Sequence, residues 1–217
     1  MKYKGIIFDL DGVICSTDEY HYQAWKALAT RLSIPFDHTV NNRLRGVSRM
    51  ESLEIILEKA EQGYTDAEKL AFAEEKNILY RQLLANMSPD DLADEVRNTL
   101  HTLRGAGLKL AIGSSSKNTP FILERIGLSG FFDAVADGNM ITHSKPHPEV
   151  FLKAADMIGL SPSECLVVED AHAGVEAAVA GGFDCAAIGD ACTDERAKWH
   201  LISFGELNGV VSLVFVS

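Results

Sequence analysis

The stretch GIIFDLDGV, residues 5–13, decides how the rest of the chain is interpreted. Its apolar residues form a short continuous run bounded by a polar turn, which is typical of a strand buried within a sheet. Alternate residues of a strand point to the same face, so Asp9 and Asp11 would project together from its carboxyl end. Two buried like charges repel each other and are costly to desolvate, so they need a cation, a shared proton or both. The alternative, a pair of turn acids that cap the next helix, explains the regular apolar lead-in less well.

The composition indicates one large or two small globular domains and argues against several kinds of partner. The chain has 217 residues, 47% of them hydrophobic, and a formal net charge of -11. That acidity argues against nucleic acid or an anionic membrane surface as a partner, and no apolar run is long enough to cross a bilayer. The four cysteines show no metal-binding spacing and no signal peptide precedes the first strand, so we expect a cytoplasmic protein.

A helical block follows this first strand. Capping-box patterns at Ser16, Ser48 and Thr65 predict the starts of three helices, because a serine or threonine followed three residues later by glutamate satisfies two free N–H groups. No convincing strand pattern occurs between these helices. We therefore predict that residues 16–87 form an α-helical cap domain inserted directly after the first strand.

From residue 88 onward, apolar strand-like runs alternate with helical patterns. The predicted strands are residues 108–112, 134–136, 165–168 and 185–188. Repeated strand–helix units form a parallel sheet with right-handed crossovers. The predicted fold class is therefore α/β, with a Rossmann-like parallel-sheet core domain of residues 1–15 and 88–217 that the helical cap interrupts. The apolar stretch 210–216 receives no place in this prediction.

Polar side chains follow the ends of several predicted strands. After Asp9 and Asp11, the next strand of the core is followed by Ser114, and a later strand by Glu169 and Asp170. Ligands of open α/β sheets bind at the edge formed by the carboxyl ends of the strands. Three or four carboxylates at that edge make an oxygen-only site, which suits Mg²⁺. Glu169 and Asp170 alone could equally be helix-capping acids.

Two further features favour an anion beside that metal. Ser114, Ser115 and Ser116 precede a predicted helix, whose free N–H groups and dipole attract negative charge, and Lys145 adds a positive charge. A carboxylate nucleophile, Mg²⁺, a hydroxyl donor and a lysine together describe phosphoryl transfer through an aspartyl phosphate. Taken alone, Ser114 is more commonly a helix cap and Lys145 a surface lysine. Their joint placement after consecutive strands is what favours chemistry.

In order and spacing, these residues resemble the four motifs of the haloacid dehalogenase superfamily. The motifs are Asp9-Leu10-Asp11-Gly12-Val13, Ser114, Lys145-Pro146 and Glu169-Asp170. The helical insert resembles the small α-helical cap of that superfamily. Other stretches resemble its branch of sugar phosphomutases: Glu19-Tyr20-His21, Ala24-Trp25-Lys26-Ala27-Leu28, Gly46-Val47-Ser48-Arg49, Lys76-Asn77 and Ser116-Lys117-Asn118.

The resemblance implies a role for each matching residue. Asp9 would be the nucleophile that becomes phosphorylated, and Asp11 the general acid/base that serves the sugar hydroxyl. Mg²⁺ would be held by Asp9, the backbone carbonyl of Asp11, Glu169 and Asp170. The transferring phosphoryl group would be bound by Ser114, Ser115 and Lys145, whose bond to Pro146 would be cis. The implied contacts to the rest of the substrate are His21, Trp25, Gly46, Val47, Ser48, Arg49, Ser52, Lys76, Ser116, Lys117 and Asn118.

The cap residues would separate a mutase from a phosphatase. A mutase passes through a sugar bisphosphate, so it needs a second anion site away from Asp9, and Arg49 at a predicted helix start could bind that phosphate bidentately. Arg49 could instead be a surface arginine. His21 could pack between cap and core and not act as a relay to Asp11, and packing there is the favoured role for Trp25.

We expect a Mg²⁺-dependent enzyme that interconverts β-D-glucose 1-phosphate and glucose 6-phosphate through an aspartyl phosphate and β-glucose 1,6-bisphosphate. It would act as a monomer on a small sugar phosphate. One alternative is a sugar-phosphate phosphatase on the same scaffold. Another is a receiver-type signalling domain, which the long cap and the acid two positions after Asp9 disfavour. The chain departs from the resemblance at Ser16, where relatives commonly have aspartate, and at residues 93–95, which replace a frequent Pro-Gly turn.

Overall fold

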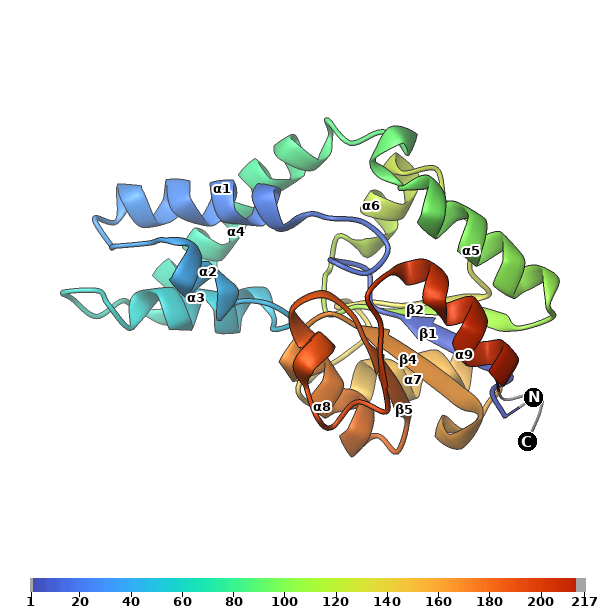
Figure 1. Ribbon diagram of the computed structural model, residues 1–217. Helices are drawn as coiled ribbons and strands as arrows, with labels where there is room; N and C mark the ends of the chain where they lie inside the picture. The colour runs from blue at the N-terminus through green and yellow to red at the C-terminus, as the bar shows by residue number, and fades with distance from the viewer. Residues whose placement is uncertain (1, 214–217) are drawn as a thin grey trace.

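The computed structural model describes residues 2–213 and is built around a six-stranded parallel sheet (Figure 1). The strand order is β3-β2-β1-β4-β5-β6. The strands are β1 (Gly5–Phe8), β2 (Lys109–Gly113), β3 (Ala134–Ala136), β4 (Cys165–Glu169), β5 (Asp184–Ala187) and β6 (Trp199–His200). In the register of the sheet, Phe8 of β1 pairs with Ile112 of β2 and with Val168 of β4. The carboxyl ends of β1, β2 and β4 therefore meet at one edge, as the predicted α/β fold requires.

Helices cover both faces of the sheet (Figure 1). They are α5 (Asp94–Gly105), α6 (Thr119–Arg125), α7 (Glu149–Met157), α8 (His172–Ala180) and α9 (Leu207–Leu213). Ile6 and Phe8 of β1 belong to the apolar cluster that also contains residues of α5, α6 and α9, whereas Ile7 belongs to the cluster that contains residues of α7 and α8. Both faces of β1 are therefore buried, which explains its continuous apolar run. The predicted apolar stretch 210–216 falls partly in α9, and its residues 214–216 lie outside the described residues.

Between β1 and α5 the chain forms four helices at one end of the molecule (Figure 1). They are α1 (Asp18–Arg31), α2 (His38–Asn42), α3 (Arg49–Leu57) and α4 (Asp66–Leu84), and no strand occurs within residues 16–87, all of which the structure describes. Trp25, Leu28, Leu53 and Ile56 are part of an apolar cluster of their own. The boundaries of a separate cap domain stay a prediction, to which this separate cluster lends support.

Two of the three predicted capping boxes are present. The side chains of Ser48 and Thr65 accept N–H groups of α3 and α4, and a glutamate three residues later returns the contact in each. The short 3₁₀ helices of the chain are η1 (Pro89–Asp91), η2 (Pro162–Glu164), η3 (Gly189–Thr193) and η4 (Phe204–Glu206).

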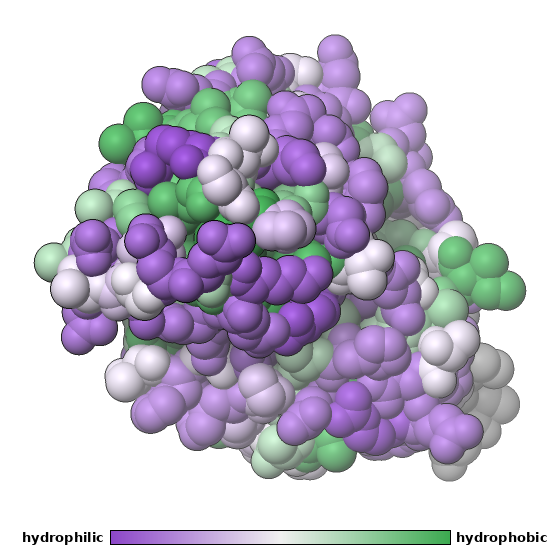
Figure 2. Space-filling view, turned by 90° about the vertical axis from the view of Figure 1, so that its left-hand side faces the viewer, coloured by the Kyte–Doolittle hydropathy of each residue, from purple (hydrophilic) through white to green (hydrophobic). Residues whose placement is uncertain are grey.

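Figure 2 looks onto the end formed by α1 to α4, where hydrophilic side chains surround smaller hydrophobic patches. Within residues 2–213, no helix combines the length and the apolar character that crossing a membrane requires.

Candidate active site

Three buried carboxylates and one lysine meet at the carboxyl ends of β1 and β4. Asp9, Glu169 and Asp170 are 6%, 0% and 6% exposed, and one oxygen from each lies within 4.8 Å of the others. Lys145 is fully buried and donates hydrogen bonds to Asp9 and, over 2.7 Å, to Glu169. Its peptide bond to Pro146 is cis, as the resemblance implied. Asp9, Lys145, Glu169 and Asp170 are called the acid cluster below.

Burial dominates the protonation of the acid cluster. It raises the pKa of Asp9 to about 8, although the positive charge of Lys145 acts in the opposite direction. It raises the pKa of Asp170 to about 9, and the negative charges of Glu169 and Asp9 add to that rise. These raised pKa values show that three ionised carboxylates would carry more negative charge than one lysine balances, so a divalent cation fits this site. An all-oxygen set of ligands is the kind that Mg²⁺ prefers.

Two glycines make room for these carboxylates. A Cβ atom on Gly174, in the first turn of α8, would lie 1.6 Å from Oε1 of Glu169, and one on Gly12 would lie 2.1 Å from Oδ2 of Asp170. Oε2 of Glu169 accepts the backbone N–H groups of Asp170 at 2.6 Å and Ala171 at 3.1 Å. Backbone contacts therefore fix the orientation of the carboxylate, which preorganises it to hold a cation.

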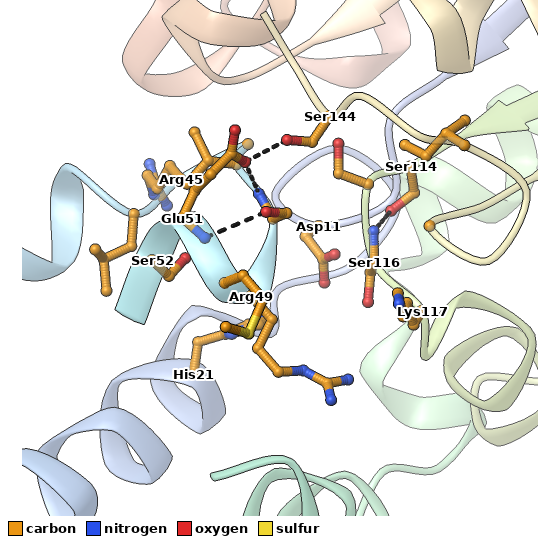
Figure 3. A pocket seen from close by; sticks show the side chains of 18 of the residues that line it. Asp11, His21, Arg45, Arg49, Glu51, Ser52, Ser114, Ser116, Lys117 and Ser144 are labelled. Carbon is orange, nitrogen blue, oxygen red and sulfur yellow. Dashed lines mark hydrogen bonds between the residues drawn. The ribbon is translucent and has the colours of Figure 1, made fainter. Parts of the chain in front are cut away.

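Asp11 follows the same strand and extends into the space between the sheet edge and the inserted helices (Figure 3). Burial raises its pKa, although a hydrogen bond from the hydroxyl of Thr17 and the charges of Lys145 and Lys76 act to lower it. The capping box predicted at Ser16 is wrong. The residue that precedes α1 is Thr17, and its hydroxyl makes no cap because it donates to Asp11.

The loop after β2, from Ser114 to Asn118, is called the serine loop. Oγ of Ser114 accepts the N–H of Ser116 at 3.1 Å, and Oγ of Ser116 accepts the N–H of Asn118 at 3.2 Å. The hydroxyl of Ser115 is buried and has no hydrogen-bond partner within the part of the chain that the structure describes. Helix α6 begins only at Thr119, so the serines lie in the loop before the helix and Ser114 is not its cap.

The opposite side of the space is cationic. Lys76 of α4 is 3% exposed, and its Nζ lies 3.0 Å from Nδ1 of His21 on α1. Burial lowers the pKa of Lys76 and of His21 well below the ordinary values, and the charge of Arg49 lowers both further. The Nζ atom also lies over the rings of Trp25 and Tyr80, at 4.7 and 4.2 Å from their centroids. Arg49, Lys76 and His21 are called the cationic end below.

Arg49 is the first residue of α3, and Figure 3 shows it beside the same space as Asp11. Its side chain is 23% exposed, and its Nη1 lies 3.6 Å from Oε2 of Glu74. Burial lowers the pKa of Arg49, so the surroundings favour an anion close to the guanidinium. Trp25, by contrast, is 1% exposed and packs within the apolar cluster of α1 to α4.

A single cavity of about 1000 Å³ joins the acid cluster to the cationic end. Every site residue named from the sequence lines it except Lys145 and Glu169, which are fully buried. The predicted residues on its wall are Asp9, Asp11, His21, Trp25, Gly46, Val47, Ser48, Arg49, Ser52, Lys76, Ser114, Ser115, Ser116, Lys117, Asn118 and Asp170. The cavity therefore brings together segments that are far apart in the sequence.

Sequence reasoning missed the contacts that join the inserted helices to the core around this cavity. Arg45 forms an ion pair with Asp190, and its Nη1 lies 3.7 Å from Oδ2 of Asp170. The hydroxyl of Ser144 donates to Glu51 of α3 (Figure 3). The partners named here for Arg45 and Ser144 are distant in sequence, so local patterns could not predict these contacts. The one feature that could have drawn attention to Arg45 is its position directly before the predicted substrate-binding stretch.

Comparison with known proteins gives consistent results. A family model described as haloacid dehalogenase-like hydrolase matches residues 3–182. A β-phosphoglucomutase of Bacillus subtilis is 43% identical over 188 residues, which cover 86% of this chain and 83% of that protein. A fructose-1-phosphate phosphatase of Escherichia coli is 33% identical over 184 residues, covering 84% of this chain and 95% of that protein. The crystal structure of a β-phosphoglucomutase from Clostridium difficile superimposes with a TM-score of 0.92 at 33% identity and covers 99% of this chain and all of that one, 100%.

Proposed function

The chain belongs to the haloacid dehalogenase-like hydrolase family, and from that premise we propose that it is a Mg²⁺-dependent β-phosphoglucomutase. It would interconvert β-D-glucose 1-phosphate and glucose 6-phosphate. One observation carries the proposal: a single cavity has Asp9 of the acid cluster on one side and Arg49 and Lys76 on the other. A sugar bisphosphate needs two anion-binding sites, whereas hydrolysis of a monophosphate needs one. Family membership also removes the receiver-type alternative.

The acid cluster would hold the metal. Asp9, Glu169 and Asp170, together with the backbone carbonyl of Asp11, supply oxygen ligands of the kind that Mg²⁺ prefers. When bound, the ion supplies positive charge that offsets the carboxylates and the phosphoryl oxygens. Lys145 would bind a phosphoryl oxygen from the buried side of the cluster, since its Nζ already donates to Asp9.

The two aspartates would divide the chemistry between them. The carboxylate of Asp9 attacks phosphorus and takes the phosphoryl group, while Asp11 gives its proton to the sugar oxygen that leaves. The raised pKa of Asp11 suits a group that must hold a proton at neutral pH. Thr17 would orient the Asp11 carboxyl group through its hydroxyl. In the return step Asp11 takes a proton from the sugar hydroxyl that attacks the phosphorylated Asp9.

The cationic end would hold the phosphate that is not being transferred. Arg49 offers a planar fork of N–H donors that matches phosphate, and an anion beside Lys76 would reduce the cost of burying its charge. His21, whose pKa is lowered, would stay neutral and keep the Lys76 amine in place through their contact of 3.0 Å. The serine loop would close the cavity from the core. Reorientation of a bisphosphate would then exchange its two phosphates between these ends.

A sugar-phosphate phosphatase is the second candidate, because the acid cluster alone suffices for hydrolysis and a phosphatase is among the relatives. The two are separated by incubating the enzyme with Mg²⁺, β-glucose 1-phosphate and a trace of β-glucose 1,6-bisphosphate. We expect glucose 6-phosphate to form in large excess over free phosphate. Predominant release of free phosphate would overturn the mutase proposal and leave the phosphatase.

A further inference from the structure

A second group of possible metal ligands lies outside the acid cluster, on the loop of residues 141–148 and the start of α7. His143, His147 and Glu149 each place one ligand atom within 4.8 Å of the others. Both histidines are exposed and also line the edge of the cavity, while Glu149 is half-buried. We call residues 141–148 the rim loop. None of these three side chains has a part in the proposed phosphoryl transfer.

The carboxylate in this group is held in a fixed orientation by the backbone. Oε1 of Glu149 accepts the N–H of Thr142 at 3.0 Å, and Oε2 accepts the N–H of His143 at 2.8 Å. These backbone hydrogen bonds hold the pKa of Glu149 below its usual value, so the carboxylate is ionised. A ligand that is already oriented and charged loses little entropy when a cation binds.

The imidazole groups lie at distances that suit one cation. Nδ1 of His143 is 3.2 Å from Oε2 of Glu149. Two ligand atoms on one tetrahedral Zn²⁺, each about 2.0–2.2 Å from the metal, are about 3.3–3.6 Å apart, which is close to that separation. The rings of His143 and His147 lie 4.7 Å apart, centroid to centroid, with 37° between their planes. Two protonated rings at this distance would repel each other, whereas two neutral rings can share a metal.

A surface ion pair between His143 and Glu149 is the simpler interpretation of this contact. It does not involve His147, whose Nδ1 accepts the backbone N–H of Glu149 at 3.3 Å, so the Nε2 atom of His147 is the one that a cation could bind. The three possible ligands are also close in sequence, so one cation could bind all of them within a single short segment. The combination of two imidazoles and one fixed carboxylate therefore favours a metal site over a simple pair.

We propose that His143, His147 and Glu149 form a second divalent-cation site, distinct from the acid cluster, that takes Zn²⁺ or a similar cation. Imidazole ligands favour Zn²⁺ and its neighbours over Mg²⁺, which prefers oxygen. Three protein ligands leave a fourth position for water, as in other Zn²⁺ sites with two histidines and a glutamate. The two cations would therefore occupy different sites of the same chain.

The proposed site lies on a loop that contacts both the inserted helices and the acid cluster. The same rim loop carries Ser144, which donates to Glu51 of α3 (Figure 3), and Lys145, which reaches the acid cluster. Ser144 and Lys145 lie between His143 and His147, so a cation bound by the two histidines would restrain the backbone on both sides of Ser144 and Lys145. It would thereby hold the loop that connects the inserted helices to the phosphoryl site in one conformation.

The test is a calorimetric titration of the chelator-treated full-length protein with Zn²⁺ in an excess of Mg²⁺. We expect one equivalent of Zn²⁺ to bind, and His143→Gln and His147→Gln each to weaken the affinity at least about tenfold, as loss of one ligand requires. The matched control is His101→Gln, which removes an exposed imidazole on α5, away from the rim loop. The control should bind Zn²⁺ as the parent does.

Two further measurements could refute the proposal. Titration with Co²⁺ should give the visible absorption bands of a tetrahedral site with nitrogen ligands, and the double variant H143Q/H147Q should lose them. Equal Zn²⁺ affinity in the parent and the double variant would overturn the proposal. So would displacement of Zn²⁺ by Mg²⁺ at millimolar concentration, because that result would place the Zn²⁺ in the acid cluster.

Discussion

The two ends of the cavity differ in the sign of the charge that burial penalises. In the acid cluster, burial raises the pKa values of Asp9 and Asp170, which favours a bound cation. At the cationic end, burial lowers the pKa values of Lys76 and Arg49, which favours a bound anion. The protein thus prepares one side of the cavity for a metal and the other for a phosphate. This contrast is what a mutase that handles a bisphosphate needs, and each prediction below tests one side of it.

The largest effect should come from removing the nucleophile at the acid cluster. Asp9→Asn keeps the size of the side chain but removes the oxygen that accepts the phosphoryl group, so formation of glucose 6-phosphate should fall at least about 10⁴-fold. The measurement is a coupled assay of glucose 6-phosphate with saturating Mg²⁺.

The control for this prediction is Asp66→Asn, which removes an exposed carboxylate at the start of α4. Its activity should match that of the parent. If Asp9→Asn retained more than about one hundredth of the parent's activity, Asp9 would not be the nucleophile.

The next largest effect should come from the cationic end. Arg49→Ala should lower mutase turnover about 30-fold or more, because truncating one partner of a buried charge pair costs about 2–5 kcal/mol. Hydrolysis of a small ester such as p-nitrophenyl phosphate, which needs only the acid cluster, should change by less than about threefold, since the lost contact acts on the second phosphate.

Arg43→Ala is the matched control for Arg49→Ala. Arg43 lies in the same region of the chain but forms an ion pair with Glu58 at the surface, with half of its side chain exposed. It should leave both activities unchanged. Equal losses of mutase and esterase activity in Arg49→Ala would count against the assignment of the cationic end and favour the phosphatase.

The contrast between the two ends also separates what the sequence predicts from what it does not. Asp9 and Glu169 follow apolar strand runs, and the register of a parallel sheet brings such strand ends together. Their positions could therefore be inferred from local patterns. The cationic end is assembled from α1, α3 and α4, so Lys76 meets His21 only because these helices pack together. Its residues were named by resemblance alone.

Two details show why local patterns fail at such sites. Ser16 fits a capping-box pattern, but the residue that precedes α1 is Thr17, and its hydroxyl donates to Asp11 and caps no helix. Arg45 only adjoins the predicted substrate-binding stretch, and its partners in the core, Asp170 and Asp190, are over a hundred positions away. A contact that depends on how one layer packs on another has no local signature in the chain.

A smaller effect should come from Thr17, which lies between the two ends and positions Asp11. Thr17→Val keeps the shape of the side chain but removes the hydrogen-bond donor, so kcat should fall about tenfold to a hundredfold. The hydrogen bond lowers the pKa of Asp11, so its loss should raise that pKa further. The alkaline limb of the pH–rate profile, where the general acid loses its proton, should then move to higher pH.

Thr17→Ser keeps the hydroxyl and should restore both the rate and the position of that limb. A loss of rate in Thr17→Val with an unmoved limb would contradict the positioning role. It would indicate damage to the start of α1 instead, which circular dichroism of the two variants would reveal.

The smallest expected effect is on the pH dependence of the free energy of unfolding, which should differ between the acid cluster and the cationic end. Asp9 has a pKa of about 8 in the folded protein, against an ordinary value of 3.8. Between these two values the folded state keeps a proton that the unfolded chain has lost, so the free energy of unfolding falls as the pH rises, and it levels off above about pH 8. The pKa of Lys76 is lowered below its ordinary 10.5. Where the folded protein has released the proton that the unfolded chain still holds, a rise in pH raises the free energy of unfolding, so the stability penalty of burying Lys76 declines as the pH approaches the ordinary value.

Asp9→Asn and Lys76→Met should therefore respond to pH in opposite directions. In thermal melts with a chelator, the gain in Tm from Asp9→Asn should grow between about pH 7 and 8 and level off above it. The gain from Lys76→Met should shrink as the pH rises toward 10.5, and each change should be about 2–4 °C per kcal/mol of changed stability. His21 adds little in this window, because its lowered pKa leaves it neutral in the folded protein and the unfolded chain is almost neutral there as well. Parallel slopes in the two variants would mean that the acid cluster and the cationic end do not carry opposite electrostatic penalties, and the case for two distinct anion- and cation-binding ends would lose its physical basis.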